Sequence, residues 1–362
     1  MSWARLDTME VDKTKVPNTD QTDFAVPVIL TDNNYKSVAN GGYMQNASAY
    51  DIKMYSDSGL TTQIPYQRIF HNLTTGAIYY RVKRTLSTSV NTNIYIAFGD
   101  ASITTDQSDA ANTYVTSCKA FFEFGDGTTL DSNDSTSNAI TGTNTSVTAT
   151  TGAFAGGTLG GGGSFNGTTA KIDLGDNLGL TGDMTITFWG YSTNWSQAFS
   201  KASAATGVAS PIDNSFSGAF NQGRMSVGDG STATGHTIRT ANTPPASTWT
   251  FYSWQISGTA WSVRKNNTAD NSGTGLSQTR TNNAGLSMLI GANNANSEHF
   301  SGKMSALRFY NSALSVDWRD TEYNSENSPS TFSSHTFSTP ASGGSLVYSA
   351  RINQSVKRSA YY

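Results

Sequence analysis

The acidic residues of this chain are the first candidates for chemistry. Glycoside hydrolysis needs two carboxyl groups about 5 to 9.5 Å apart, and alternate residues of one strand can supply them because they share a face. Glu123 and Asp126 instead stand at the expected end of a strand, where an acid usually forms a turn. Asp317, Asp320 and Glu322 fall on an expected helical segment, and we expect them to be solvated. No paired-acid motif occurs, so the sequence predicts that the chain is not a glycosidase.

Nucleophilic, metal and phosphate chemistry also lack their usual patterns. No Gly-x-Ser-x-Gly turn accompanies a usable histidine, as a serine hydrolase would need. No zinc pattern can be built from the single cysteine and the four histidines, which are Cys118, His71, His236, His299 and His335. The glycine-rich run 156–163 is not followed by Gly-Lys-[Ser/Thr], so it is not a phosphate loop. We expect it to be a flexible or bulged sheet edge, and we expect no enzymatic activity.

Sugar binding makes smaller demands, because it needs an exposed aromatic platform with planar polar side chains around it. Two expected loops, 190–197 and 291–300, carry such side chains. The candidate glycan-binding residues in them are Tyr191, Asn194, Trp195, Asn294, Asn296, Glu298 and His299. Trp189, Trp254 and Trp261 lie within expected strands, so we assign them to the core. The metal ligands, if there are any, cannot be chosen from the sequence.

Composition narrows the class of protein. Of the 362 residues only 14% are charged, glycine numbers 34, and the formal net charge is −3. This balance favours an all-β protein with many loops and gives no case for binding nucleic acid or an anionic membrane. No apolar run approaches the ~18 residues of a membrane span. The first 20 residues lack the apolar region of a signal peptide, so we expect either a trimmed export signal or release within a virus particle by lysis.

The elements that must position the candidate residues are short strands. Alternating apolar and polar residues between turn signals predict a first β-sandwich domain over 23–115, with strands at 24–30, 50–55, 64–70, 77–82 and 92–98. We assign the polar residues 1–22 to an N-terminal arm, in which Trp3 caps this first domain.

A second set of strands follows residue 118. Strands are expected at 164–165, 170–174, 184–191, 224–228, 236–240, 249–256, 260–265, 286–291 and 302–310. The strand 249–256 has aromatic residues on both faces, which predicts a central, buried position. The segment 316–323 is the one plausible helix, with Ser315 as its N-cap.

Residues 327–362 lie beyond these strands. The first part is rich in Ser and Thr and resembles a linker, whereas 346–352 alternates like a strand. We expect this C-terminal linker and docking strand to pair with the chain's own first domain, with a neighbouring subunit or with another protein by strand addition.

Three segments of the second region resemble laminin-G-like domains of the concanavalin A-like lectin/glucanase superfamily. They are SFNGTTAKIDLGDNLGLTGDMTITFW at 164–189, FFEFGDGTTL at 121–130 and FSGKMSALRFYNSALSVDWRDTEYN at 300–324. The resemblance covers 118–326 and implies that this domain is a concanavalin A-like jelly roll. The family often has an acid just after the Gly-x-[Ile/Met] of its closing strand, but here Ser305 and Ala306 stand there. A bound calcium ion, which is common in the superfamily, is also compatible with the sequence.

The first region resembles a domain of unknown function that precedes laminin-G-like domains in prokaryotic and phage surface proteins. The matching segments are VPVIL at 26–30, YDIKMYSDSG at 50–59, IPYQ at 64–67, IYYRV at 78–82 and NTNIYIAFGD at 91–100. That family has no established catalytic residues, so the resemblance assigns no site residue to the first domain.

These observations predict a non-enzymatic structural and adhesive protein on the virion surface, either a capsid decoration, a head-fibre protein or a tail-associated protein. Its expected partners are capsid or tail proteins, further copies of itself in a homo-oligomer, and host-surface glycans. The alternative is an extracellular, secreted prokaryotic carbohydrate-binding protein, and a glycoside hydrolase is a third hypothesis. Paired acids in a cleft would favour the third hypothesis.

Overall fold

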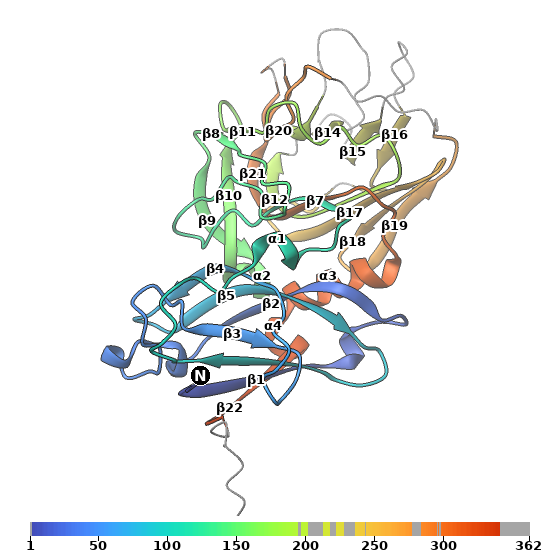
Figure 1. The fold of residues 1–362 in the computed structure, drawn as a ribbon. Helices are drawn as coiled ribbons and strands as arrows, with labels where there is room; N and C mark the ends of the chain where they lie inside the picture. Colours follow the sequence, from blue (N-terminus) through green and yellow to red (C-terminus); the bar gives the residue numbers. More distant parts are fainter. Residues whose placement is uncertain are drawn as a thin grey trace, which may run out of the picture.

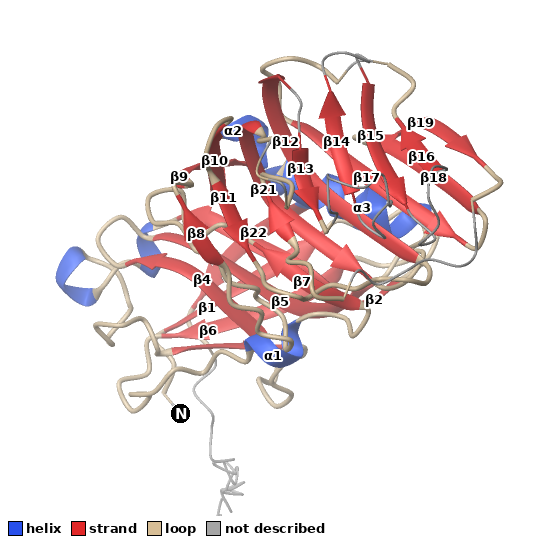
Figure 2. Ribbon diagram, turned by 90° about the horizontal axis from the view of Figure 1, so that it is seen from above, coloured by secondary structure: helices blue, strands red, loops and turns tan. Residues whose placement is uncertain are grey.

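The protein consists of two β-sandwiches, one on top of the other (Figure 1). The computed structural model describes residues 2–194, 197–201, 213–217, 222–227, 236–242, 244–276, 284–294, 296 and 298–340. Figure 2 shows that strands make up most of both sandwiches. The predicted all-β fold is therefore confirmed. Within the described residues, no helix is both long and apolar enough to cross a membrane.

The first sandwich has two antiparallel sheets. The four-stranded sheet has the order β22 (Ser333–Ser338), β1 (Arg5–Val11), β6 (Thr92–Phe98) and β3 (Ile52–Tyr55). The three-stranded sheet has the order β2 (Gln21–Thr31), β5 (Ala77–Leu86) and β4 (Tyr66–Asn72). All five strands expected between residues 24 and 98 are present. Their alternate apolar residues, such as Ile94, Ile96 and Phe98, are fully buried between the sheets.

The larger sheet of the second sandwich has eight strands. Its order is β19 (Thr268–Gly273), β18 (Ala260–Lys265), β17 (Thr250–Ser257), β12 (Met184–Asn194), β21 (Ser301–Tyr310), β10 (Leu159–Asn166) and β9 (Thr148–Ala153), and β7 (Cys118–Phe122) pairs with the second half of β21. As predicted, β17 is central and buried.

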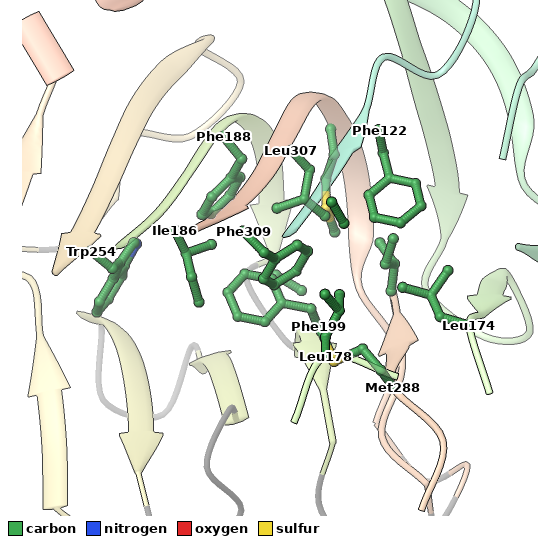
Figure 3. Packing of buried hydrophobic residues seen from close by; sticks show 14 of the residues in the cluster. Phe122, Leu174, Leu178, Ile186, Phe188, Phe199, Trp254, Met288, Leu307 and Phe309 are labelled. Atoms are coloured by element: carbon green, nitrogen blue, oxygen red, sulfur yellow. The ribbon is translucent and has the colours of Figure 1, made fainter. Parts of the chain in front are cut away.

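The facing sheet has seven strands. Its order is β16 (His236–Arg239), β15 (Gln222–Val227), β14 (Asp213–Ser217), β13 (Gln197–Ser200), β20 (Leu289–Ile290), β11 (Lys171–Asp173) and β8 (Thr143–Thr145). Figure 3 shows the core between the two sheets, where Ile186, Phe188 and Trp254 meet Phe199 and Met288. Trp189 and Trp254 are buried and Trp261 packs against the core, in agreement with the sequence analysis.

Four helices accompany the strands: α1 (Ala110–Thr113), α2 (Phe154–Gly157), α3 (Val316–Asn327) and α4 (Pro329–Phe332). The side chain of Ser315 accepts a hydrogen bond from the Trp318 amide, so the predicted N-cap of α3 is confirmed. The expectation that Glu322 is solvated is wrong. Its side chain is 3% exposed, because α3 lies between the two sandwiches rather than on the surface (Figure 1).

The two ends of the described chain lie side by side in the first sandwich. Strand β22 pairs with β1 over six residues, and Asp7 on β1 accepts hydrogen bonds at one oxygen from Tyr35, at 2.7 Å, and from His335 on β22, at 2.8 Å. Residues 5–11, which were assigned to an arm, are therefore a strand in the interior of a sheet.

The segment expected to be a linker is also structured. Helix α3 continues to Asn327, and α4 and β22 follow it directly. Phe332 is buried in the core of the first sandwich. The whole second sandwich is thus inserted between β6 and β22 of the first. The strand expected at 346–352 lies outside the described residues.

The glycine-rich run is not a flexible edge. Most of it belongs to β10, which pairs with both β21 and β9. A Cβ on Gly161 would lie 2.0 Å from the carbonyl oxygen of Gly125. The glycines are needed because the turn at 125–127 packs backbone to backbone against this strand.

Candidate functional site

The most accessible aromatic pair of the candidate loops lies where β12 and β17 meet. Gly190 pairs with Thr250, and this register places Tyr191 beside Trp249, with ring centroids 5.6 Å apart and planes at 55°. Across the other edge of β12, Lys303 pairs with Tyr191, and its Nζ lies 5.3 Å from the Tyr191 ring centroid. All three side chains are partly exposed. We call Tyr191, Trp249 and Lys303 the rim platform.

Glycine is required at two positions beside the rim platform. A Cβ on Gly157, whose φ is +95°, would lie 2.8 Å from Cδ1 of Trp249. A Cβ on Gly302 would lie 2.3 Å from the carbonyl oxygen of Tyr191. Both contacts are closer than any side chain tolerates, so the rings can take these positions only because glycine stands at 157 and 302.

The predicted loop 291–300 lies at the same end of the sandwich. Asn194 pairs with Ser301, the Ser192 hydroxyl donates to the Ser301 carbonyl, and the Gly167 amide donates to the Phe300 carbonyl at 3.0 Å. The structure therefore brings the two predicted loops next to each other. Trp195 lies outside the described residues, and only the backbone of Asn194 is described.

The side chains of loop 291–300 divide into structural and exposed ones. Asn294 donates to the Ser287 carbonyl at 2.8 Å, which holds the loop. Asn296 is exposed and accepts a hydrogen bond from Lys171 at 3.0 Å. Glu298 is exposed. His299 is 9% exposed, and neither ring nitrogen has a hydrogen-bond partner among the described residues. Among the described residues of this loop, Asn296 and Glu298 are thus the ones that a ligand could reach.

Trp249 and Lys303 were not predicted as site residues. The sequence predicts Trp249 only as part of a buried strand and Lys303 only as part of the closing strand. Neither stands near Tyr191 in the sequence, and only the pairing of β12 with β17 and β21 brings them together. No local signal could have identified them.

A cluster of buried charges joins the two sandwiches, and we call it the interface cluster. Arg81 on β5 of the first sandwich donates to Glu123 at 2.8 Å and to Glu326 on α3 at 2.8 Å. Arg308 on β21 also pairs with Glu326. Trp189 donates to the second oxygen of Glu326 at 2.8 Å, and all five side chains are at most 4% exposed.

Glu326 of the interface cluster is held as a charged hydrogen-bond acceptor. Burial raises the pKa of Glu326, but Arg308 and Arg81 outweigh burial, and the net pKa is lowered. Burial works against the charge of Arg308 as well, yet Glu326 and Glu322 raise its pKa above the usual range. Glu326 and Arg308 therefore stay ionised and paired at neutral pH, and neither is poised to donate or accept a proton.

Among the described residues, no three His, Cys, Asp or Glu side chains are grouped so that they could hold a metal ion. The carboxylates of the interface cluster lie close together, but arginines compensate them and solvent does not reach them.

Comparison with known proteins gives a family match for most of the second sandwich. Residues 162–318 match the family model Laminin_G_3, the concanavalin A-like lectin/glucanases superfamily, and the region before residue 162 has no family match. No curated protein matches the chain.

Several solved structures align with part of this chain, with TM-scores below 0.5. Domain 4 of AbnA, a GH43 extracellular arabinanase from Geobacillus stearothermophilus, in complex with arabinotriose, is 21% identical, with a TM-score of 0.45, over 57% of this chain and 98% of that chain. The receptor binding domain of botulinum neurotoxin C/D mosaic serotype is 10% identical, with a TM-score of 0.42, over 57% and 51%. A heptameric SAP-like pentraxin from Limulus polyphemus is 14% identical, with a TM-score of 0.32, over 43% and 80%. The chain spans about half the length of the neurotoxin domain. The resemblance predicted for residues 118–326 is therefore confirmed by a family match over residues 162–318.

Proposed function

We propose that this protein is a non-enzymatic structural and adhesive protein of a virus particle, and that its concanavalin A-like domain binds host-surface glycans at the rim platform. The observation that carries the proposal is the partly exposed pair of Tyr191 and Trp249 with Lys303 beside it. The exposed Asn296 and Glu298 extend the surface at the same end of the sandwich.

The chemistry of the rim platform suits a sugar. An aromatic ring offers a flat apolar face to the C–H side of a pyranose, and polar side chains around it take the hydroxyl groups. Lys303 supplies up to three donors beside the rings. Glycines at 157 and 302 leave the space that the Trp249 ring and the Tyr191 carbonyl oxygen occupy. Binding of this kind needs no cofactor.

The structural part of the proposal rests on the join between the sandwiches. The interface cluster and the apolar residues around it fix the two sandwiches against each other. A rigid two-domain body can transmit load between an assembly and a ligand, which suits a protein that docks on capsid or tail proteins or assembles with its own copies. The same body would also serve a secreted carbohydrate-binding protein, so the location of the protein needs its own test.

We propose no hydrolase activity, because the buried carboxylates are not placed as a glycosidase needs them. In the part of the chain that the structure describes, Glu123, Glu322 and Glu326 are buried at the domain interface and paired with arginines. A glycosidase needs one such acid protonated and both facing the substrate.

A glycan array with the full chain tests the binding proposal, with Tyr191→Ala as the site variant and Tyr43→Ala as the matched control. Tyr43 is also an exposed tyrosine beside a cationic side chain, Arg5, but it lies in the first sandwich. We expect Tyr191→Ala to weaken binding about tenfold, since an aromatic contact contributes roughly 0.5–1.5 kcal/mol. Equal binding by both variants, or no glycan bound by the unaltered chain, would overturn the proposal.

Mass spectrometry of gradient-purified particles and of the secreted fraction tests the location. The virion proposal expects the chain in particles at a stoichiometry near that of the capsid or tail proteins. Its presence only as a soluble or cell-surface protein would reject the virion role and leave the glycan-binding proposal standing.

A further inference from the structure

A cleft of about 170 Å³ opens between the two sandwiches. One wall is the three-stranded sheet of the first sandwich, with Ile29 and Phe70. The opposite wall is the turn at 126–128 and the start of β10, with Asp126, Thr158 and Leu159. The cleft is separate from the rim platform, because neither Tyr191 nor Trp249 lines it.

The size of the cleft limits its occupant. An engineered protein cavity of about 150 Å³ binds benzene, so a cleft of about 170 Å³ takes one six-membered ring and not an extended chain. The cleft is open at one side, which would let a ring enter with its substituents still in solvent.

The cleft is lined by both apolar side chains and oxygen atoms, and this combination limits which rings can bind. Ile29, Phe70 and Leu159 are partly exposed apolar side chains, and Asp126 and Thr158 supply oxygen atoms. Among the described residues that line the cleft there is no Lys, Arg or His, so nothing in it would attract an anion. An apolar face combined with hydroxyl groups on the ring edge fits this lining.

Asp126 is prepared to act as an acceptor. The hydrogen bonds it receives from Thr128 and Thr129 all use Oδ1, which leaves Oδ2 for a ligand. Partial burial raises the pKa of Asp126, but the hydrogen bonds from Thr129 and Thr128 more than offset this and its pKa is lowered. The carboxylate is therefore held ionised and oriented before a ligand binds.

The glycines of this region keep the cleft open. Gly127 has a φ of +93°, and a Cβ there would lie 3.2 Å from the Gly160 carbonyl oxygen. The turn and β10 therefore meet through backbone atoms alone, and no side chain from either glycine fills the cleft.

We infer that the cleft between the sandwiches is a second sugar site, which holds a single uncharged pyranose unit against Phe70 and Leu159 with its hydroxyl groups on Asp126. This inference goes beyond the glycan binding proposed for the rim platform, and it concerns different residues. The ring would contact both sandwiches at once, so its binding would also depend on the fixed join between them.

Saturation-transfer NMR and titration calorimetry with the full chain test this inference. The probes are the methyl pyranosides of glucose, galactose, mannose and N-acetylglucosamine. We expect at least one of them to bind. Asp126→Asn keeps the Oδ1 acceptor of the turn and removes the charge, and we expect it to lower the affinity at least tenfold.

Two further variants make the test decisive. Thr158→Phe changes an exposed residue at the mouth of the cleft, so it should block binding without disturbing a core. Tyr43→Ala, which lies outside both the cleft and the rim platform, should leave cleft binding unchanged. If none of the four sugars binds the unaltered chain, or if binding survives both cleft variants, the inference is overturned. Loss of binding in Tyr191→Ala alone would reject the cleft and support the rim platform.

Discussion

The interface cluster and the rim platform each place a cation beside aromatic rings, but the cluster is buried and the platform is partly exposed. In the interface cluster, the Arg81 guanidinium lies 5.1 Å from the Phe121 ring centroid and 5.4 Å from that of Phe154. At the rim, Lys303 lies 5.3 Å from the Tyr191 ring centroid. Arg81 is 1% exposed and paired with two glutamates, whereas Lys303 is partly exposed, and no ion pair is found for it among the described residues.

The difference shows what decides the role of a cation beside aromatic rings. Where burial is complete, each charge must be compensated internally, so the group can only hold the structure together. Where the rings and the cation keep part of their surface in water, their remaining hydrogen-bonding and stacking capacity is open to a ligand. Both places put a cation beside aromatic rings, and the degree of burial separates the structural role from the proposed binding role.

The largest effect is expected from breaking the interface cluster. Glu326→Ala removes the carboxylate that Arg81 and Arg308 share, and we expect the free energy of unfolding to fall by about 3–5 kcal/mol, because buried cations lose their partner. The matched control is Asp106→Ala, which breaks an exposed pair with Arg68 and should cost at most ~1 kcal/mol. Urea unfolding followed by tryptophan fluorescence measures both. Similar losses in the two variants would contradict the assigned difference.

An acid titration sharpens the same comparison with a smaller effect. The pKa of Glu326 is lowered, since Arg308 and Arg81 outweigh the effect of burial. Its contribution to stability is therefore present above the usual glutamate range, near about pH 4, and is lost as the pH falls through the lowered value. We expect the free energy of unfolding to decrease in this acidic range.

The same titration of Glu326→Gln is the control for that assignment. The variant cannot lose a charge at 326, so its stability at neutral pH is lower and its further decrease in acid is shallower. Identical slopes for the two proteins would show that other carboxylates cause the acid loss.

The smallest of these effects is expected at the glycine-rich strand. Gly161→Ala would place a Cβ 2.0 Å from a backbone oxygen, and overpacking of this kind costs about 1–3 kcal/mol. The control is Gly182→Ala, where a Cβ would meet nothing within 4 Å and the change should stay within about 0.5 kcal/mol. Thermal unfolding of the pair measures this. No difference between them would mean that the turn at 125–127 can move away from β10.

Much of the fold could be predicted because its strands carry their own pattern. The alternation in 92–98 predicts a strand, and the aromatic residues on both faces of 249–256 predict a central, buried one. The N-cap at Ser315 is equally local. Each of these features depends on neighbours within a few positions, and the structure confirms all of them.

What the sequence could not predict depends on pairings between distant segments. The polar character of residues 1–22 predicts an arm, but residues 5–11 form β1, where the Asp7 carboxyl group is buried against Tyr35 and His335. Glu322 was taken for a solvated acid because the first sandwich that covers it lies far away in the sequence. Tyr191 could be selected as a candidate, whereas its partners Trp249 and Lys303 could not, since only the sheet brings them together.

The position of β22 has a consequence for how the protein is made. The first sandwich cannot complete its four-stranded sheet until β22 leaves the ribosome, and the second sandwich is synthesised in between. At about 5–20 residues per second, the roughly 230 residues between Phe98 and Ser333 take on the order of 10 to 50 seconds. During that interval the outer edge of β1 is unpaired and open to pairing with another nascent chain. The first sandwich begins the chain, but it is the last part of the molecule to be completed.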